Sequence, residues 1–170
     1  MVEKRYEWAR GATLEEHSRR KHKILREYLF EYLVVRCRLP QQSRFRLAIV
    51  DGFAGGGRYR CGAAGSPIIV LEELKHAVET VNLDRAAQGL GQVAVECLLV
   101  LNDFSSDALE SLKTHLAPVQ AQIAASMPNL HVRVEYLNQP FEAAYPAIKE
   151  LLEAGRYRNV LFNLDQCGHS

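Results

Sequence analysis

The alternation of apolar runs with amphipathic segments constrains the fold of this chain more than any other feature. Runs rich in β-branched and aliphatic residues are typical of buried strands, and three- and four-residue apolar spacing is typical of helices. We expect strands at residues 45–50, 93–101, 131–137 and 159–164, and helices that begin near 13, 66, 105 and 141. Strands that alternate with amphipathic helices favour right-handed crossovers. The sequence therefore predicts an α/β, Rossmann-like fold with a mostly parallel sheet and helices on both faces.

Start signals support three of these helices. Thr13 and Glu16 form a capping box, in which each side chain can bond the other residue's amide. Ser66 before Pro67 is typical of an N-cap followed by proline at the first helical position. Ser105 can cap the next helix. The first helix carries an apolar stripe that includes Tyr28, and Pro40 is expected to end it.

The length of 170 residues favours one domain, with a basic amphipathic helix over 1–44 and a Rossmann-like core over 45–170. No apolar run approaches the roughly 20 residues that cross a bilayer, and no signal peptide begins the chain. We therefore expect a cytoplasmic protein without membrane contact. The cysteines show no metal-ligand spacing, so no metal site is predicted.

The net charge of +1 hides an uneven distribution. Residues 1–46 hold twelve Lys and Arg against six Asp and Glu, whereas the remainder holds nine against fourteen. A basic segment can bind nucleic acid, because clustered cations displace counterions from phosphates. A basic helix that serves solubility alone is the competing interpretation.

The most specific segment follows the first strand, where residues 51–57 read D-G-F-A-G-G-G. Glycines let the backbone pass close to a bound nucleoside or amino-acid group, and Asp51 at the strand tip can bind an ammonium group. The dinucleotide fingerprint G-x-G-x-x-G is not met, because Arg60 occupies the third glycine position, and no phosphate-binding G-K-[ST] follows. A tight turn of purely structural use is the alternative.

Polar residues also follow the other strands. Asp103 can accept hydrogen bonds from ribose hydroxyls, or can simply complement a helix dipole. Asn138 offers an amide that can read an adenine edge. Asp165 and Gln166 follow the last strand, where a sheet enzyme holds its substrate or base, although a structural turn aspartate is the competing interpretation.

Four blocks of the chain together resemble the three-Cys-motif partner protein (TcmP) family. They are His17-Ser18 with Lys21 and the helix to Leu33, residues 50–55 (V-D-G-F-A-G), residues 65–67 (G-S-P), and residues 164–168 (L-D-Q-C-G). That family is similar to S-adenosylmethionine-dependent methyltransferases. It is named for a neighbouring protein with a radical-SAM-like three-cysteine motif.

The resemblance implies S-adenosylmethionine as cofactor and a methyltransferase activity toward nucleic acid or a partner protein. It assigns the cofactor loop to Asp51, Gly52, Phe53, Gly55 and Gly57, the ribose contact to Asp103, and the substrate side to Asp165 and Gln166. A non-catalytic partner subunit of the three-Cys-motif protein is the alternative, and a nicotinamide-dependent enzyme comes third. Gln166 replaces the proline of many relatives, so a D-P-P-Y amino-methyltransferase site is not supported.

Methyltransferase sheets usually have seven strands, and this sequence supplies four. We therefore expect the fold to be truncated after the fourth strand. In such a fold the fourth strand lies beside the first, which leaves the apolar run 160–164 at an open edge. More chain, a second copy or a partner protein is expected to pair there.

Overall fold

The computed structural model of the chain describes residues 16–164, where strands and helices alternate. The helices are α1 (Glu16–Arg36), α2 (Ser66–Ala87), α3 (Ser106–Ser126) and α4 (Phe141–Ala154). The strands are β1 (Arg44–Asp51), β2 (Ala94–Asn102), β3 (Leu130–Leu137) and β4 (Val160–Asn163). The predicted succession of elements is confirmed, with boundaries that move by a few residues.

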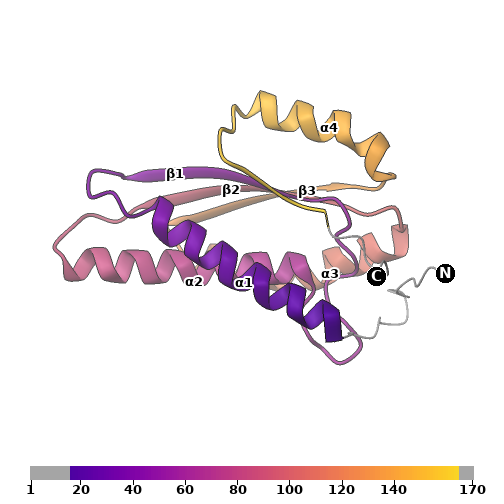
Figure 1. Ribbon diagram of the computed structural model, residues 1–170, viewed down its shortest axis with the longest axis horizontal. Coiled ribbons are helices and arrows are strands. Elements are labelled where there is room, and N and C mark those ends of the chain that lie inside the picture. The colour runs from indigo at the N-terminus through magenta and orange to yellow at the C-terminus, as the bar shows by residue number, and fades with distance from the viewer. Residues whose placement is uncertain (1–15, 165–170) are drawn as a thin grey trace.

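The four strands are all parallel and lie in the order β3-β2-β1-β4. Helices α1, α2 and α3 cover one face of the sheet, and α4 covers the other (Figure 1). This arrangement confirms the predicted Rossmann-like α/β fold with helices on both faces. The chain changes direction across the sheet at β1, so the topological switch point lies between β1 and β4, where open α/β sheets bind ligands.

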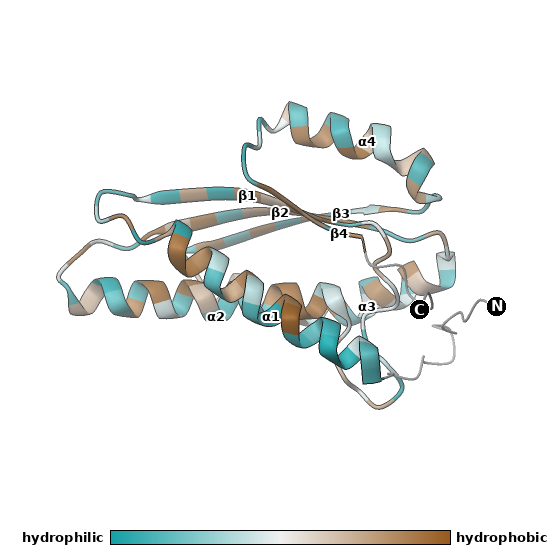
Figure 2. Ribbon diagram, viewed as in Figure 1, coloured by the Kyte–Doolittle hydropathy of each residue, from teal (hydrophilic) through white to brown (hydrophobic). Residues whose placement is uncertain are grey.

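Side-chain alternation along β1 and β2 divides the interior into two cores. Odd-numbered residues such as Leu47 and Leu99 join the larger core with α1, α2 and α3. Even-numbered residues such as Val50 and Val100 pack against Ala144 and Ile148 of α4 in the smaller core. Both strands need apolar residues on both faces, which explains their nearly continuous hydrophobic runs (Figure 2). Within residues 16–164, no helix combines the length and hydrophobicity needed to cross a bilayer.

Helix α1 belongs to the same core as the sheet. Leu29 and Leu33 are buried there, and Arg26 forms ion pairs with Glu72 at 2.8 Å and Glu73 at 3.3 Å on α2. The helix ends at Arg36, four residues before Pro40, and its predicted start at Thr13 lies outside the described residues. The described part of the basic segment therefore contributes to one domain with the strands.

Arg85 fixes the edge of the sheet at which the strands begin. Its guanidinium is buried, and it donates to the carbonyl of Leu39 at 2.9 Å and to those of Gln42 and Gly91 at 2.6 Å. These carbonyls belong to the two loops that lead into β1 and β2. The loops that carry the predicted site lie at the opposite edge, where the strands end.

Candidate functional site

Backbone hydrogen bonds bring the loops after β1, β2, β3 and β4 together at the carboxyl edge of the sheet. The Gly52 amide donates to the carbonyl of Asn163 at 3.2 Å, and the Ala54 amide donates to that of Asn102 at 2.9 Å. The Asp103 amide donates to the carbonyl of Leu137 at 3.1 Å. Segments far apart in sequence therefore form one continuous surface here, as the predicted topology requires.

Asp51 lies at the centre of this surface, and its side chain is only 1% exposed. The hydroxyl of Ser66 donates to Oδ2 at 2.5 Å, the Phe53 amide donates to Oδ1 at 3.2 Å, and the Asn163 amide group approaches Oδ2 at 3.4 Å. Three elements therefore converge on one carboxyl group. The prediction that Ser66 caps α2 is wrong, because Gly65 is the N-cap and the Ser66 hydroxyl bonds Asp51 instead.

Burial raises the pKa of Asp51 to about 6. The bonds from Ser66, Phe53 and Asn163 favour the ionised form, but they only partly offset the loss of solvation, and the nearby Asp103 carboxylate raises the pKa further. Within residues 16–164, no Lys or Arg side chain contacts this carboxyl group. Within that part of the chain, an ionised Asp51 has no cationic partner of the kind that buried carboxylates usually have.

Asp103 holds the glycine loop from the neighbouring strand. Its Oδ2 accepts from the Gly55 amide at 2.9 Å, and its Oδ1 accepts from the Ser105 amide at 2.9 Å. The side chain is partly exposed, so each oxygen keeps a lone pair for a further donor. The hydroxyl of Ser105 caps α3 by accepting from the Ala108 amide at 3.2 Å, as predicted.

Backbone conformation or close packing requires glycine at two positions of the loop. Gly57 has φ +92°, and a Cβ atom there would lie 2.9 Å from Cβ of His115 on α3. A Cβ atom on Gly52 would lie 2.7 Å from the ring of Phe141, at the start of α4. The loop is therefore pressed against helices on both faces of the sheet.

An aromatic group lies beside the loop on the α4 side. The rings of Phe53 and Phe141 are 5.7 Å apart, and those of Phe141 and Tyr145 are 6.2 Å apart. Phe53 is partly exposed. Aromatic faces of this kind can stack on a purine base.

Asn138 is exposed, but its amide group is already engaged. Its Nδ2 donates to the carbonyl of Asp103 at 2.9 Å and to that of Phe104 at 3.2 Å. These bonds leave the side-chain oxygen as the part of the amide that a ligand could use. Asp165 and Gln166 lie outside the described residues.

The sequence interpretation missed Asn102, which is buried and ties three loops together. Its amide group donates to the carbonyl of Gly52 at 3.1 Å and to that of Gln139 at 2.9 Å, and its oxygen accepts from the Gln139 amide at 3.2 Å. A polar residue at the end of an otherwise apolar strand was the available signal. Asn163 gave the same kind of signal at the end of β4, whereas the bond from Ser66 to Asp51 was missed because the sequence context of Ser66 predicts a cap of α2.

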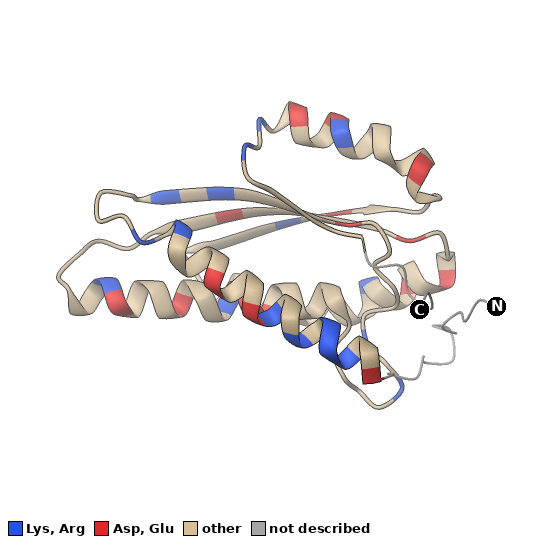
Figure 3. Ribbon diagram, viewed as in Figure 1, with Lys and Arg blue, Asp and Glu red and all other residues tan. Residues whose placement is uncertain are grey.

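Exposed cations gather on the first turns of α1, close to this edge of the sheet (Figure 3). Arg19, Arg20 and Lys23 are exposed, and Lys23 lies 3.9 Å from Glu27. The ring of His22 lies 5.7 Å from that of Tyr59, which follows the glycine loop. The basic end of α1 is therefore adjacent to the candidate site rather than remote from it.

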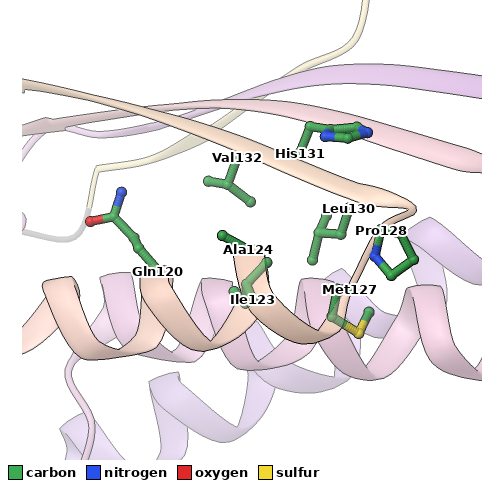
Figure 4. A pocket seen from close by; sticks show the side chains of 8 residues that line it. All are labelled: Gln120, Ile123, Ala124, Met127, Pro128, Leu130, His131 and Val132. Carbon is green, nitrogen blue, oxygen red and sulfur yellow. The ribbon is translucent and has the colours of Figure 1, made fainter.

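A cavity of about 270 Å³ lies elsewhere, between the last turns of α3 and the beginning of β3 (Figure 4). Its walls include Ile123, Met127 and Val132. None of its lining residues belongs to the loop cluster, by which we mean the loops after β1, β2, β3 and β4 at the carboxyl edge of the sheet. Among residues 16–164, no three His, Cys, Asp or Glu side chains converge in a way that would hold a metal ion.

Comparisons of the chain with protein-family models, with curated proteins and with solved structures found no match. The geometry of the carboxyl edge and the sequence motifs at that edge therefore carry the proposed function.

Proposed function

We propose that the chain binds S-adenosylmethionine and acts as a methyltransferase. The observation that carries this proposal is the buried Asp51 carboxyl group, which lies under a glycine loop without a Lys or Arg contact in the described residues. A ligand with an ammonium group would supply the missing cation. The long 3.4 Å contact from Asn163 is the bond that such a ligand would displace most easily.

The other residues of the site fit the remaining parts of this cofactor. Asp103 would accept hydrogen bonds from the ribose hydroxyls, and the oxygen of Asn138 would accept from the adenine amino group. Phe53 would stack on the base, and Gly52, Gly55 and Gly57 would let the backbone approach it. When bound, the cofactor supplies an electrophilic methyl group on its sulfonium, so aligning the acceptor provides much of the catalysis.

The acceptor is assigned by sequence alone. Asp165 and Gln166 would orient it on the substrate side of the sheet, as the resemblance to the TcmP family implies. Nucleic acid and a partner protein are the two acceptor classes that we propose. The cations on α1, next to the Tyr59 loop, support the first.

Calorimetry with S-adenosylmethionine, S-adenosylhomocysteine and NAD tests the cofactor. We expect both adenosyl ligands to bind and Asp51→Asn to weaken them by about tenfold or more, since a charged hydrogen bond is lost. Asp84→Asn is the matched control, because it removes an exposed carboxylate from α2. Tight NAD binding without a response to S-adenosylhomocysteine would overturn the assignment.

A non-catalytic partner subunit is the second candidate, and the open edge of β4 favours it. In the described residues β4 pairs with β1 only, and Phe162 beside this edge is exposed. Such a subunit would bind a three-Cys-motif protein without binding either adenosyl ligand. Co-purification of the two proteins, combined with the calorimetry above, separates the two functions.

A further inference from the structure

Each of the three consecutive glycines in the loop is held by a different contact. The Gly55 amide donates to Asp103, and the Gly57 carbonyl accepts from the Gly65 amide at 2.7 Å. The carbonyl of Gly56, between them, is contacted by two side chains of α3. These are Ser111, whose hydroxyl donates at 2.9 Å, and His115, whose Nδ1 lies at 2.9 Å.

Ser111 and His115 are one turn apart on α3, so both side chains reach the same carbonyl. Oγ of Ser111 lies 3.3 Å from Nδ1 of His115. A carbonyl oxygen only accepts hydrogen bonds, so the contact is a hydrogen bond in the tautomer of His115 that carries its hydrogen on Nδ1. The pair therefore acts as a two-pronged donor, which we call the α3 clamp.

The clamp determines where the next amide points. The described peptide bonds are all trans, so the carbonyl of Gly56 and the amide of Gly57 point in opposite directions. Because the carbonyl faces α3, the Gly57 amide is directed away from the helix. Close packing reinforces this orientation, since a Cβ atom on Gly57 would meet Cβ of His115 at 2.9 Å.

We propose that Ser111 and His115 are positioning residues that fix the Gly56–Gly57 peptide so that its amide is presented to the bound ligand. This inference rests on the proposed adenosyl ligand. A loop that is already ordered loses less conformational entropy on binding, so the clamp increases affinity without touching the ligand.

The test uses the full chain with Ser111→Ala, His115→Leu and their combination. We expect the double variant to bind S-adenosylhomocysteine about tenfold or more weakly, because both donors to the carbonyl are lost. His115→Asn should restore binding to near the original affinity, because its amide can donate from about the position of Nδ1. Ser126→Ala is the matched control: that hydroxyl lies on the same helix and bonds its own backbone at Gln122.

Hydrogen exchange of the Gly55–Gly57 amides provides a readout that does not depend on the ligand. We expect faster exchange at these amides in the double variant and unchanged exchange in β1 and β2. If the double variant fails to fold, Ser111→Ala alone must show the same two effects in smaller size.

Three results would overturn the clamp. The first two are that the double variant exchanges its loop amides at the wild-type rate, or that it binds S-adenosylhomocysteine with the wild-type affinity. The third is that His115→Asn fails to restore the affinity that His115→Leu loses. A different result is that the double variant exchanges its loop amides faster while neither it nor the wild type binds an adenosyl ligand. That result would support the clamp's effect on the loop and reject the proposed cofactor, so failure of the clamp and failure of the proposed function are distinguishable.

Discussion

At the scale of single residues, Asp51 couples the site to the stability of the fold. Its pKa of about 6 in the folded chain lies above the ordinary value of 3.8. The folded state therefore holds this proton more tightly than the unfolded state, and the resulting stabilisation is present below pH 4 and lost as the pH rises through 6.

We predict that Asp51→Asn removes this pH dependence. Two pKa units correspond to about 3 kcal/mol, so the difference in free energy of unfolding between wild type and variant should change by about 2–3 kcal/mol between pH 4 and pH 7.5. Over that range the wild type loses stability relative to the variant. Urea unfolding at both pH values measures the difference, with Asp84→Asn as control. Parallel curves for wild type and Asp51→Asn would contradict the buried ionised group.

Gly57 and Gly89 make a matched pair for a second prediction. Both have positive φ, +92° and +72°, but a Cβ atom on Gly89 meets nothing within 4 Å, whereas one on Gly57 meets His115. Gly89→Ala should cost about 1 kcal/mol of stability from the backbone conformation alone. Gly57→Ala should cost about 2–4 kcal/mol, because the loop must also move away from α3. Thermal unfolding compares the two, and equal costs would show that the contact with α3 is unimportant.

At the scale of elements, the positions of β1 and β2 were predictable because a strand buried on both faces needs a nearly continuous apolar run. The contacts of Ser66 and His115 were not, since they depend on which loop folds against which helix. Tyr28 shows the same limit: its spacing placed it in the apolar stripe of α1, yet it is 55% exposed. Periodicity identifies a face of a helix, but the neighbouring elements decide how much of that face is covered.

The basic turns of α1 carry the third prediction. If nucleic acid is the acceptor, single-stranded or duplex oligonucleotides should bind with an affinity that falls steeply with salt. Reversing Arg19, Arg20 and Lys23 to Glu should weaken binding by at least about tenfold and lower the salt slope by about 2–3, one for each lost phosphate contact. The affinity for S-adenosylhomocysteine should stay unchanged, because these side chains lie outside the loop cluster.

Fluorescence anisotropy at several salt concentrations measures this effect. Lys149→Glu is the control, since that side chain is exposed on α4, on the opposite face of the sheet. Oligonucleotide binding that does not depend on salt, or no binding at low salt, would favour the interpretation that the basic residues of α1 serve solubility alone. An equal loss in the Lys149→Glu variant would show that net charge rather than the α1 surface is responsible.

At the scale of the whole molecule, β3 and β4 form the two edges of the described sheet, and β4 is the edge beside β1. Phe162 and Leu164 are 47% and 46% exposed, and a cavity of about 300 Å³ lies between α1, β1 and β4. No charged side chain lies in β4, although charges are a usual protection of edge strands. The surface beside β4 therefore has the apolar character that the predicted covering of this edge requires.

We predict that the 170-residue chain self-associates reversibly through this edge, and that Phe162→Lys reduces the association. A lysine there places a charge beside the unpaired backbone groups and removes exposed apolar area. Leu83→Lys is the control, because Leu83 is a large hydrophobic residue on α2 that is more exposed than Phe162, at 75% against 47%. Sedimentation velocity over a wide concentration range separates edge pairing from non-specific hydrophobic association. Thermal unfolding checks that both variants are folded. A chain that is monomeric at every concentration, or one that both variants affect alike, would show that the β4 edge does not drive assembly.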